Sequence, residues 1–292
     1  MGTEISVSQA VQEARKTVFA GLSQYRTPYS RELEGKSFDL IFDDGTEMAI
    51  SFPSRNRMSF NFGDSQYTET AYVMKADNGA YFIMTEVAGS SPREGLMLLL
   101  DTDESLVTGD FVKMGAVKER PNLVTREVRF GAIRYGDEPL PKKRHAYTHD
   151  LEGKKIDWTY NPSFQITHVY LKNNYYTVAF NDEMKARLQA AREADPERDA
   201  RPRMDPYYEE DCIYVKLREN LYMFSFIEKN GGGTQGMMII NTDRVHDVGC
   251  FWGPSPDGGN EAYMFSAYGR WVRDPIPEDD TLERIREKEA AK

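Results

Sequence analysis

The side chains best suited to acid–base chemistry are two histidines, a glutamate and a tyrosine in the second half of the chain. His168 and Tyr170 are two residues apart, and in a strand such residues point to the same face. Glu228 follows an alternating run of aromatic residues, and His246 begins an alternating run that ends at Trp252. Burial among apolar side chains shifts the pKa of such groups and suits them to proton transfer. We therefore predict His168, Glu228, Tyr170 and His246 as catalytic residues.

Aromatic side chains accompany these groups and can form the walls of a binding site. If the strands close into a barrel, alternate residues face its interior. The predicted ligand-binding residues are Trp158, Tyr160, Tyr176, Tyr214, Phe224 and Trp252. A purely structural role stays open for every one of these residues, because tyrosines commonly serve only to pack a barrel. The histidines and Glu228 can equally lie on an outer face, in a loop or in solvent.

Metal ligands are poorly represented in the sequence. His145 and His149 are four residues apart, but their segment contains prolines and lacks the helical periodicity that a zinc-binding pair would need. His168, His246 and Glu228 as a two-histidine, one-carboxylate set is a weaker alternative. We predict no metal and no cofactor, and a small molecule as ligand or substrate.

Short strands must position these residues. Runs of alternating apolar residues fill the chain from Leu33 to about Tyr135 and from Leu151 to about Arg270, with turns such as Asp77-Asn78-Gly79 between them. Turns this short join antiparallel strands, because parallel strands need long crossover connections. The pattern predicts an all-β protein built from antiparallel barrels.

The chain also repeats itself. Leu33-Glu34-Gly35-Lys36 returns as Leu151-Glu152-Gly153-Lys154, and Asp101-Thr102-Asp103 returns as Asn241-Thr242-Asp243. A period of roughly 120–140 residues is the size of a whole domain. The predicted organisation is an N-terminal helix (1–30), a first barrel (31–138), a linker (139–150), a second barrel (151–272) and a C-terminal tail helix (273–292).

An insertion at 181–206 is the main difference between the repeats. It is highly charged, and Met184, Leu188 and Ala191 follow helical spacing within it. Prolines follow this stripe, so we predict a short helix and an extended arm. A charged segment must run over the surface, and we expect this one to lie beside the mouth of the second barrel and to gate it. A solvated excursion without a role is the alternative.

Composition limits the classes of partner. The chain has 292 residues and a net charge of −10, and Lys142-Lys143-Arg144 is its only basic cluster, so a nucleic-acid partner is not expected. No apolar run reaches about 18 residues, so no membrane partner is expected. The N-terminus lacks the apolar core of a secretory signal, and only Cys212 and Cys250 occur, so we expect a cytoplasmic protein. The duplication is compatible with a monomer or a homodimer.

The repeated segments carry a family resemblance. The two Leu-Glu-Gly-Lys starts, the segments Tyr67–Glu69 and Tyr208–Glu210, and the run from Gly236 to Asp243 resemble those of the MoaF family. That family has an N-terminal and a C-terminal MoaF domain, each a calycin-type (lipocalin-like) barrel, and is named for its association with molybdenum cofactor genes. Trp158-Thr159-Tyr160 and His168-Val169-Tyr170 are more distantly similar to segments of the phenolic acid decarboxylases, which are small calycin barrels with tyrosines on their first strands.

These observations lead to one preferred function and its alternatives. We expect a cofactor-independent lyase, decarboxylase or isomerase acting on a small aromatic or unsaturated molecule inside the second barrel. A calycin-type barrel that binds a ligand without chemistry is the first alternative. An accessory protein associated with molybdenum cofactor genes is the second.

Overall fold

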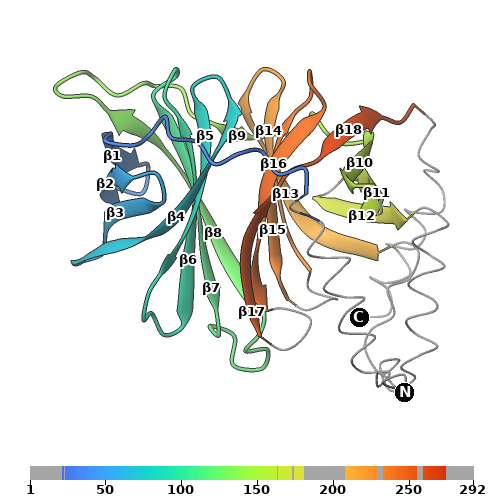
Figure 1. Ribbon diagram of the computed structural model, residues 1–292, viewed down its shortest axis with the longest axis horizontal. Coiled ribbons are helices and arrows are strands. Elements are labelled where there is room, and N and C mark those ends of the chain that lie inside the picture. The colour runs from blue at the N-terminus through green and yellow to red at the C-terminus, as the bar shows by residue number, and fades with distance from the viewer. Residues whose placement is uncertain are drawn as a thin grey trace, which may run out of the picture.

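The computed structural model describes Leu22 and residues 24–162, 164–172, 174–180, 208–228, 233–254 and 259–273. These residues form antiparallel strands and tight turns, and the strands close into two barrels that lie side by side (Figure 1). The predicted all-β fold of two tandem antiparallel barrels is confirmed. The helices predicted in 1–30 and 273–292 and the gating insertion at 181–206 lie outside the described residues, apart from a few residues at the inner ends of the first two segments.

Each barrel contributes its own set of strands. The first contains β1 (Ser37–Phe42), β2 (Glu47–Ser54), β3 (Arg57–Phe62), β4 (Ser65–Asp77), β5 (Ala80–Val87), β6 (Arg93–Asp101), β7 (Leu106–Met114) and β8 (Val124–Arg134). The second contains β10 (Lys155–Asn161), β11 (Phe164–Tyr170), β12 (Tyr175–Phe180), β13 (Tyr208–Arg218), β14 (Leu221–Ile227), β15 (Gln235–Asn241), β16 (His246–Pro254), β17 (Asn260–Phe265) and β18 (Tyr268–Trp271). In the predicted linker, β9 (Ala146–Tyr147) pairs with β13.

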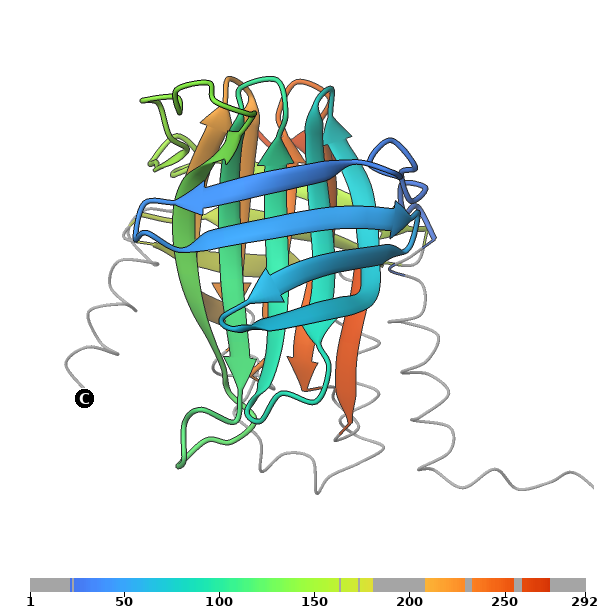
Figure 2. The same ribbon diagram turned by 90° about the vertical axis from the view of Figure 1, so that its left-hand side faces the viewer.

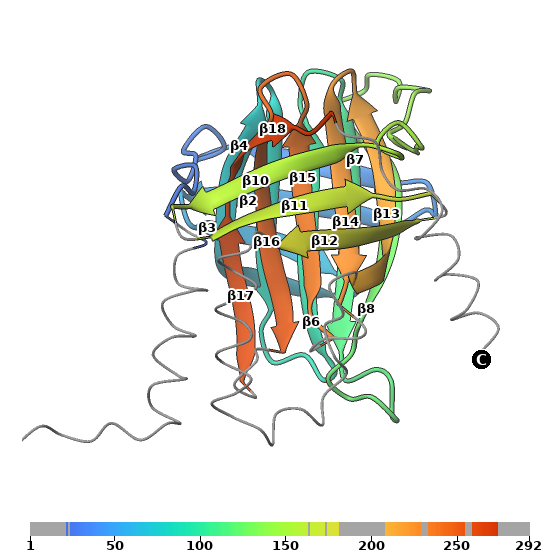
Figure 3. The same ribbon diagram turned by 90° about the vertical axis from the view of Figure 1, so that its right-hand side faces the viewer.

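Both barrels close by the same antiparallel order. In the first, β1 to β8 pair consecutively, and β8 returns to β1. In the second, the ring runs β10, β11, β12, β13, β14, β15, β16 and β18, and β18 returns to β10. The first strands of each barrel cross over the others at a steep angle, as Figure 2 shows for β1–β3 and Figure 3 for β10–β12. Each barrel is therefore a flattened ring with a front and a back layer.

The repeated Leu-Glu-Gly-Lys motif forms the turn that enters each barrel. Gly35 and Gly153 have φ angles of 76° and 77°, in the left-handed region that favours glycine. The amide of Gly153 donates to the carbonyl oxygen of Tyr170 at 2.8 Å, just as the amide of Gly35 donates to that of Phe52. The leucine of each motif is buried. The motif recurs because the same turn closes both barrels.

The two barrels pack on each other through their long strands. Strands β4 to β8 of the first barrel face β13 to β17 of the second in the middle of the molecule (Figure 1). An apolar cluster that includes Phe82, Met97, Met237 and Trp252 fills the space between them. The strands in this layer are therefore buried on both faces, one toward a barrel interior and the other toward the neighbouring barrel.

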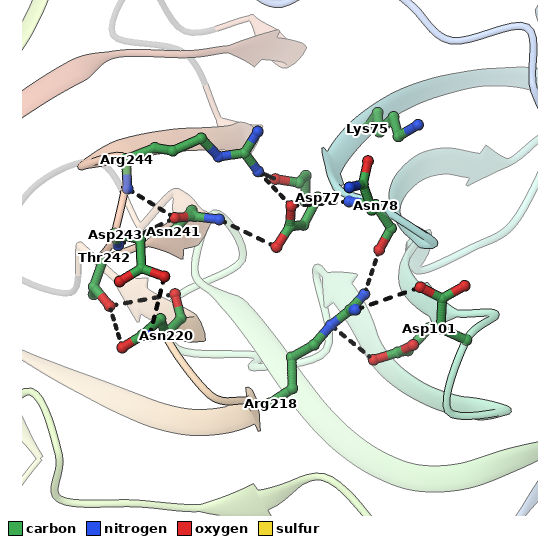
Figure 4. A network of polar contacts seen from close by, with 12 residues as sticks. Lys75, Asp77, Asn78, Asp101, Arg218, Asn220, Asn241, Thr242, Asp243 and Arg244 are labelled. Atoms are coloured by element: carbon green, nitrogen blue, oxygen red, sulfur yellow. Dashed lines mark hydrogen bonds and ion pairs between the residues drawn. The ribbon is translucent and has the colours of Figure 1, made fainter.

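Turns from both barrels meet in a polar network at one end of this interface (Figure 4). Asn241 Nδ2 donates to Asp77 Oδ2 at 3.2 Å. Strand register equates Asn241 with Asp101 and Asp77 with Arg218 in the other repeat. That equivalent pair is also in contact, because Arg218 Nε lies 3.2 Å from Asp101 Oδ2. In both pairs the second barrel supplies the amide or guanidinium group, and the first barrel supplies the carboxylate.

None of the helices in the described part of the chain is long and apolar enough to cross a membrane.

Candidate functional site

The interiors of the two barrels differ in polarity at equivalent positions. The strands of the two barrels pair in the same register, so each of these positions in one barrel has an equivalent position in the other. Apolar side chains occupy a set of interior positions in the first barrel, namely Leu40, Phe42, Ile50, Phe52, Val73 and Val107. The second barrel has Trp158, Tyr160, His168, Tyr170, Tyr214 and Asp247 at these positions. The second barrel therefore has hydrogen-bonding groups where the first has none.

His168 lies at the centre of an aromatic cage. Its side chain is buried, and the rings of Tyr170, Tyr176, Phe224 and Phe226 surround it with centroid distances of 5.7–6.5 Å. Burial lowers the pKa of His168 to about 3, so the imidazole is neutral at physiological pH. Its Nδ1 atom has no hydrogen-bond partner among the described residues. A neutral imidazole with a free ring nitrogen can donate or accept a hydrogen bond, depending on its tautomer.

Neighbouring groups hold the hydroxyl groups of Tyr170 and Tyr214. Trp158 Nε1 donates to the Tyr170 hydroxyl at 3.1 Å, and the Tyr214 hydroxyl donates to the carbonyl oxygen of Tyr175 at 2.7 Å. Burial raises the pKa of both phenols, so they stay protonated. Tyr176 packs against Phe226 with a centroid distance of 4.7 Å. The predicted ligand-binding residues Trp158, Tyr160, Tyr176, Tyr214 and Phe224 thus lie in one interior core.

Asp247 is an interior residue that the sequence analysis did not single out. It is fully buried on β16, and its Oδ1 atom accepts a hydrogen bond of 2.5 Å from the amide of Ala267. Its Oδ2 atom has no partner within the described part of the chain. Burial raises the pKa of this carboxyl well above its usual range, and the Ala267 amide and the Tyr160 hydroxyl oppose the shift. Burial therefore favours the neutral acid form of this carboxyl more than it would be favoured in an exposed aspartate.

The other candidates on β16 point away from this interior. Trp252 lies in the apolar layer between the barrels, where its Nε1 donates to Glu86 Oε1 at 3.0 Å and the Arg93 guanidinium stacks on its ring. His246 lies at the same interface, with Nε2 3.3 Å from the Thr27 hydroxyl. Burial and the charge of Arg244 lower its pKa to about 4. The structure therefore separates His246 and Trp252 from His168 and Tyr170.

This separation has a physical cause that alternation alone does not reveal. Asp247, Gly249 and Phe251 point into the second barrel, whereas Val248, Cys250 and Trp252 point toward the first. Because both faces are buried, the more hydrophobic face is not the inner one. The available signal for Asp247 was a charged residue near the start of a strand that is otherwise mostly apolar.

Glu228 lies at one end of the second barrel. It follows β14, and its backbone amide donates to the carbonyl oxygen of Thr234 at 2.8 Å. It is partly exposed. Burial, then the charge of Glu261 and then that of Glu228, raise the pKa of Tyr263, an aromatic residue packed against the interior core. Glu228 therefore lies just beyond the end of β14, two residues after Phe226 of the cage around His168.

Among the described residues, the interior of the second barrel has no buried lysine or arginine that could neutralise an anion. Among the buried side chains of the described residues there is no lysine and no arginine. A bound carboxylate would therefore meet no buried side-chain cation inside the described part of the second barrel. Within the same residues no group of three or more His, Cys, Asp or Glu side chains is arranged to hold a metal ion.

Comparison with known proteins connects the chain to the MoaF family. Residues 16–113 match the family of the MoaF N-terminal domain, which covers most of the first barrel. The protein named Protein MoaF from Klebsiella aerogenes is 29% identical over 136 residues, which make up 47% of this chain and 44% of that protein. The match therefore spans less than half of either chain. The resemblance to the MoaF family is confirmed.

Proposed function

We propose that this chain, which carries a MoaF N-terminal domain as its first barrel, binds a small aromatic or unsaturated molecule inside its second barrel and transfers a proton on it without a cofactor. The observation that carries the proposal is the polar substitution of the second interior at positions where the first interior is apolar. A barrel that serves only as scaffold gains nothing from such groups, because each buried polar group must be desolvated.

The groups of the interior suit proton transfer in a water-poor site. Tyrosine hydroxyls that stay protonated can donate hydrogen bonds to a developing negative charge. Neutral His168 can accept a proton from a bound molecule, and the aromatic cage around it excludes water. The corresponding reactions are those of a lyase, decarboxylase or isomerase. Because the described interior offers no cation, a neutral substrate is favoured over a carboxylate.

A ligand-binding barrel without chemistry is the second candidate. The depressed pKa of His168 favours it, because an imidazole that releases its proton so readily is a weak base. Both candidates place the ligand in the same interior. They differ only in whether the bound molecule is released unchanged.

The experiment compares the second interior with the residues of the first. Small aromatic and unsaturated compounds are screened against the full chain by the change in tryptophan fluorescence, and each bound compound is analysed for turnover. His168→Ile and Tyr170→Phe introduce the residue types that the first barrel has at the equivalent positions, Ile50 and Phe52. Both substitutions should weaken binding or abolish turnover. Tyr222→Phe is the matched control, because it removes a hydroxyl of the same barrel that is bound to Asp150.

The outcome decides between the candidates. Turnover that is lost in the two interior variants and kept in Tyr222→Phe supports the enzyme. Binding of an unchanged compound with the same variant pattern supports the ligand-binding barrel. If no compound binds, or if the interior variants bind as the parent does, the second barrel is not the site.

A further inference from the structure

The wall of the second barrel is interrupted at the point where Asp247 stands. The strand that closes the first barrel, β8, is continuous, and its Gly131 pairs with Val107. The corresponding strand of the second barrel is divided into β17 and β18 (Figure 3), with Ala267 between them. The backbone amide of Asp247 still donates to the carbonyl oxygen of Ala267 at 3.1 Å. The Ala267 amide, however, donates to the side chain of Asp247.

This arrangement fixes one carboxyl oxygen and leaves the other available. Oδ1 accepts the amide hydrogen of Ala267 in the segment between β17 and β18, which sets the orientation of the carboxyl plane. Oδ2 is buried and has no partner among the described residues. A buried polar atom without a partner is unfavourable because its desolvation is not compensated, so its retention needs a reason. A ligand that completes the hydrogen bond supplies one.

The surroundings determine what such a ligand must offer. Asp247 is fully buried in the second barrel, the Tyr160 hydroxyl acts on its carboxyl, and no lysine or arginine is buried among the described residues. An ionised carboxylate would have no counter-charge there, whereas the neutral acid has a hydroxyl to donate. A protonated aspartate beside a tyrosine in an apolar pocket is a known donor pair for a carbonyl oxygen, as in ketosteroid isomerase.

We propose that Asp247 donates a hydrogen bond from its carboxyl group to a carbonyl oxygen of the ligand, so that the ligands of the second barrel are neutral aromatic or unsaturated carbonyl compounds. This inference rests on the proposed function, because it names the chemical class of the molecule held in that interior. The Tyr160 hydroxyl acts on the same carboxyl and lowers its pKa, so the acid form rests on burial without a counter-charge and not on Tyr160. Ligands that carry a carboxylate are disfavoured, because they would bring a second acid beside Asp247 without a cation.

Three probes of nearly equal size test the proposal with the full chain. Acetophenone presents a carbonyl oxygen, α-methylstyrene replaces that oxygen with a methylene group, and 1-phenylethylamine presents an ammonium group. Their dissociation constants are measured by ligand-observed NMR titration at pH 7. We expect acetophenone to bind at least about fivefold more tightly than α-methylstyrene, the ratio of one net hydrogen bond, and more tightly than the amine.

Variants at two buried carboxyl groups assign the preference to Asp247. Asp247→Asn keeps a hydrogen-bond donor and should retain the preference for acetophenone. Asp247→Val installs the residue type of Val107 and should bring acetophenone and α-methylstyrene to equal affinity. Asp110→Asn is the control, because Asp110 is equally buried but lies between the barrels, where its Oδ2 accepts from Ser225 and Gln235. This control should leave the ratio unchanged.

The possible results separate this proposal from the proposed function. Equal affinity of acetophenone and α-methylstyrene for the parent overturns the carbonyl assignment while leaving an aromatic-binding interior. Tightest binding of the amine overturns it as well, because Asp247 would then act as an ionised partner for a cation. If none of the probes and no compound of the wider screen binds, the proposed function itself fails. If Asp247→Val does not fold, the ratio in Asp247→Asn and in the parent still decides.

Discussion

Acidification should destabilise the protein through His168, by an amount that can be worked out from its burial. The unfolded chain takes up a proton on this imidazole below a pKa of 6.5, whereas the folded protein does so only near 3. Between these values the unfolded state binds more protons, so the stability present above pH 6.5 is lost as the pH falls toward 3. Because pH 5 lies 1.5 units below the unfolded-state pKa of 6.5, the unfolding free energy at pH 5 is lower by about 2 kcal/mol.

A single substitution isolates this term from every other titrating group. His168→Ile removes the imidazole and installs the residue type that the first barrel has at the same position, Ile50. The rings that face His168 are those of Tyr170, Tyr176, Phe224 and Phe226, and none of them titrates between pH 5 and 7. The unfolding free energy of parent and variant is measured in urea at pH 7 and pH 5. The parent should lose about 2 kcal/mol more than the variant.

The control is His149→Gln. The His149 side chain is 78% exposed, so this substitution should leave the acid sensitivity close to that of the parent. If the parent and His168→Ile lose the same stability between pH 7 and pH 5, His168 is not a buried neutral imidazole. The interior position and the cage that the proposed function depends on would then be refuted together.

Two further predictions concern the interface and the thiols. Arg218→Ala removes the guanidinium beside the buried Asp101 carboxyl, and the unfolding free energy in urea should fall by about 3 kcal/mol, the lower end for a broken buried ion pair, because His145 and the Glu104 amide still face the carboxyl. Lys143→Ala, which removes an exposed pair, should change it by less than about 1 kcal/mol, and equal effects would contradict the buried ion pair. Burial raises the pKa of Cys212 to about 12 and that of Cys250 also well above its usual range, so neither thiol should react with a chromogenic disulfide at pH 8 until urea unfolds the chain. Rapid labelling of the folded protein would show that one of them is accessible.

The architecture could be predicted from the sequence because the repeated motif contains residues, such as glycine, that determine the local backbone conformation. Gly35 and Gly153 adopt a left-handed conformation in the same turn, so the duplicated motif marked the start of each barrel directly. The alternation of apolar and polar residues also distinguished the inner from the outer face of the strands β10 and β11. Trp158 and Tyr170 lie inside the second barrel, because the opposite faces of β10 and β11 are more polar.

Prediction failed where two cores share one strand. Hydrophobicity reports that a side chain is buried, but it does not report which of two neighbouring cores receives it. On β16 the stripe ending in Trp252 is the more apolar one and packs between the barrels, whereas Asp247 points into the second interior. The contact of Asp247 with Ala267 joins residues from different strands, and only the folded arrangement of those strands reveals it.

The exchange of roles in the polar network at the barrel interface determines which barrels can pair. Two copies of the first barrel packed in this way would bring Asp77 against Asp101, which sets carboxylate against carboxylate. Two copies of the second would bring Arg218 against Asn241, which leaves the guanidinium without an acid. Only unlike barrels complement each other. The polar network therefore favours the pairing of a first barrel with a second barrel over the pairing of two identical barrels.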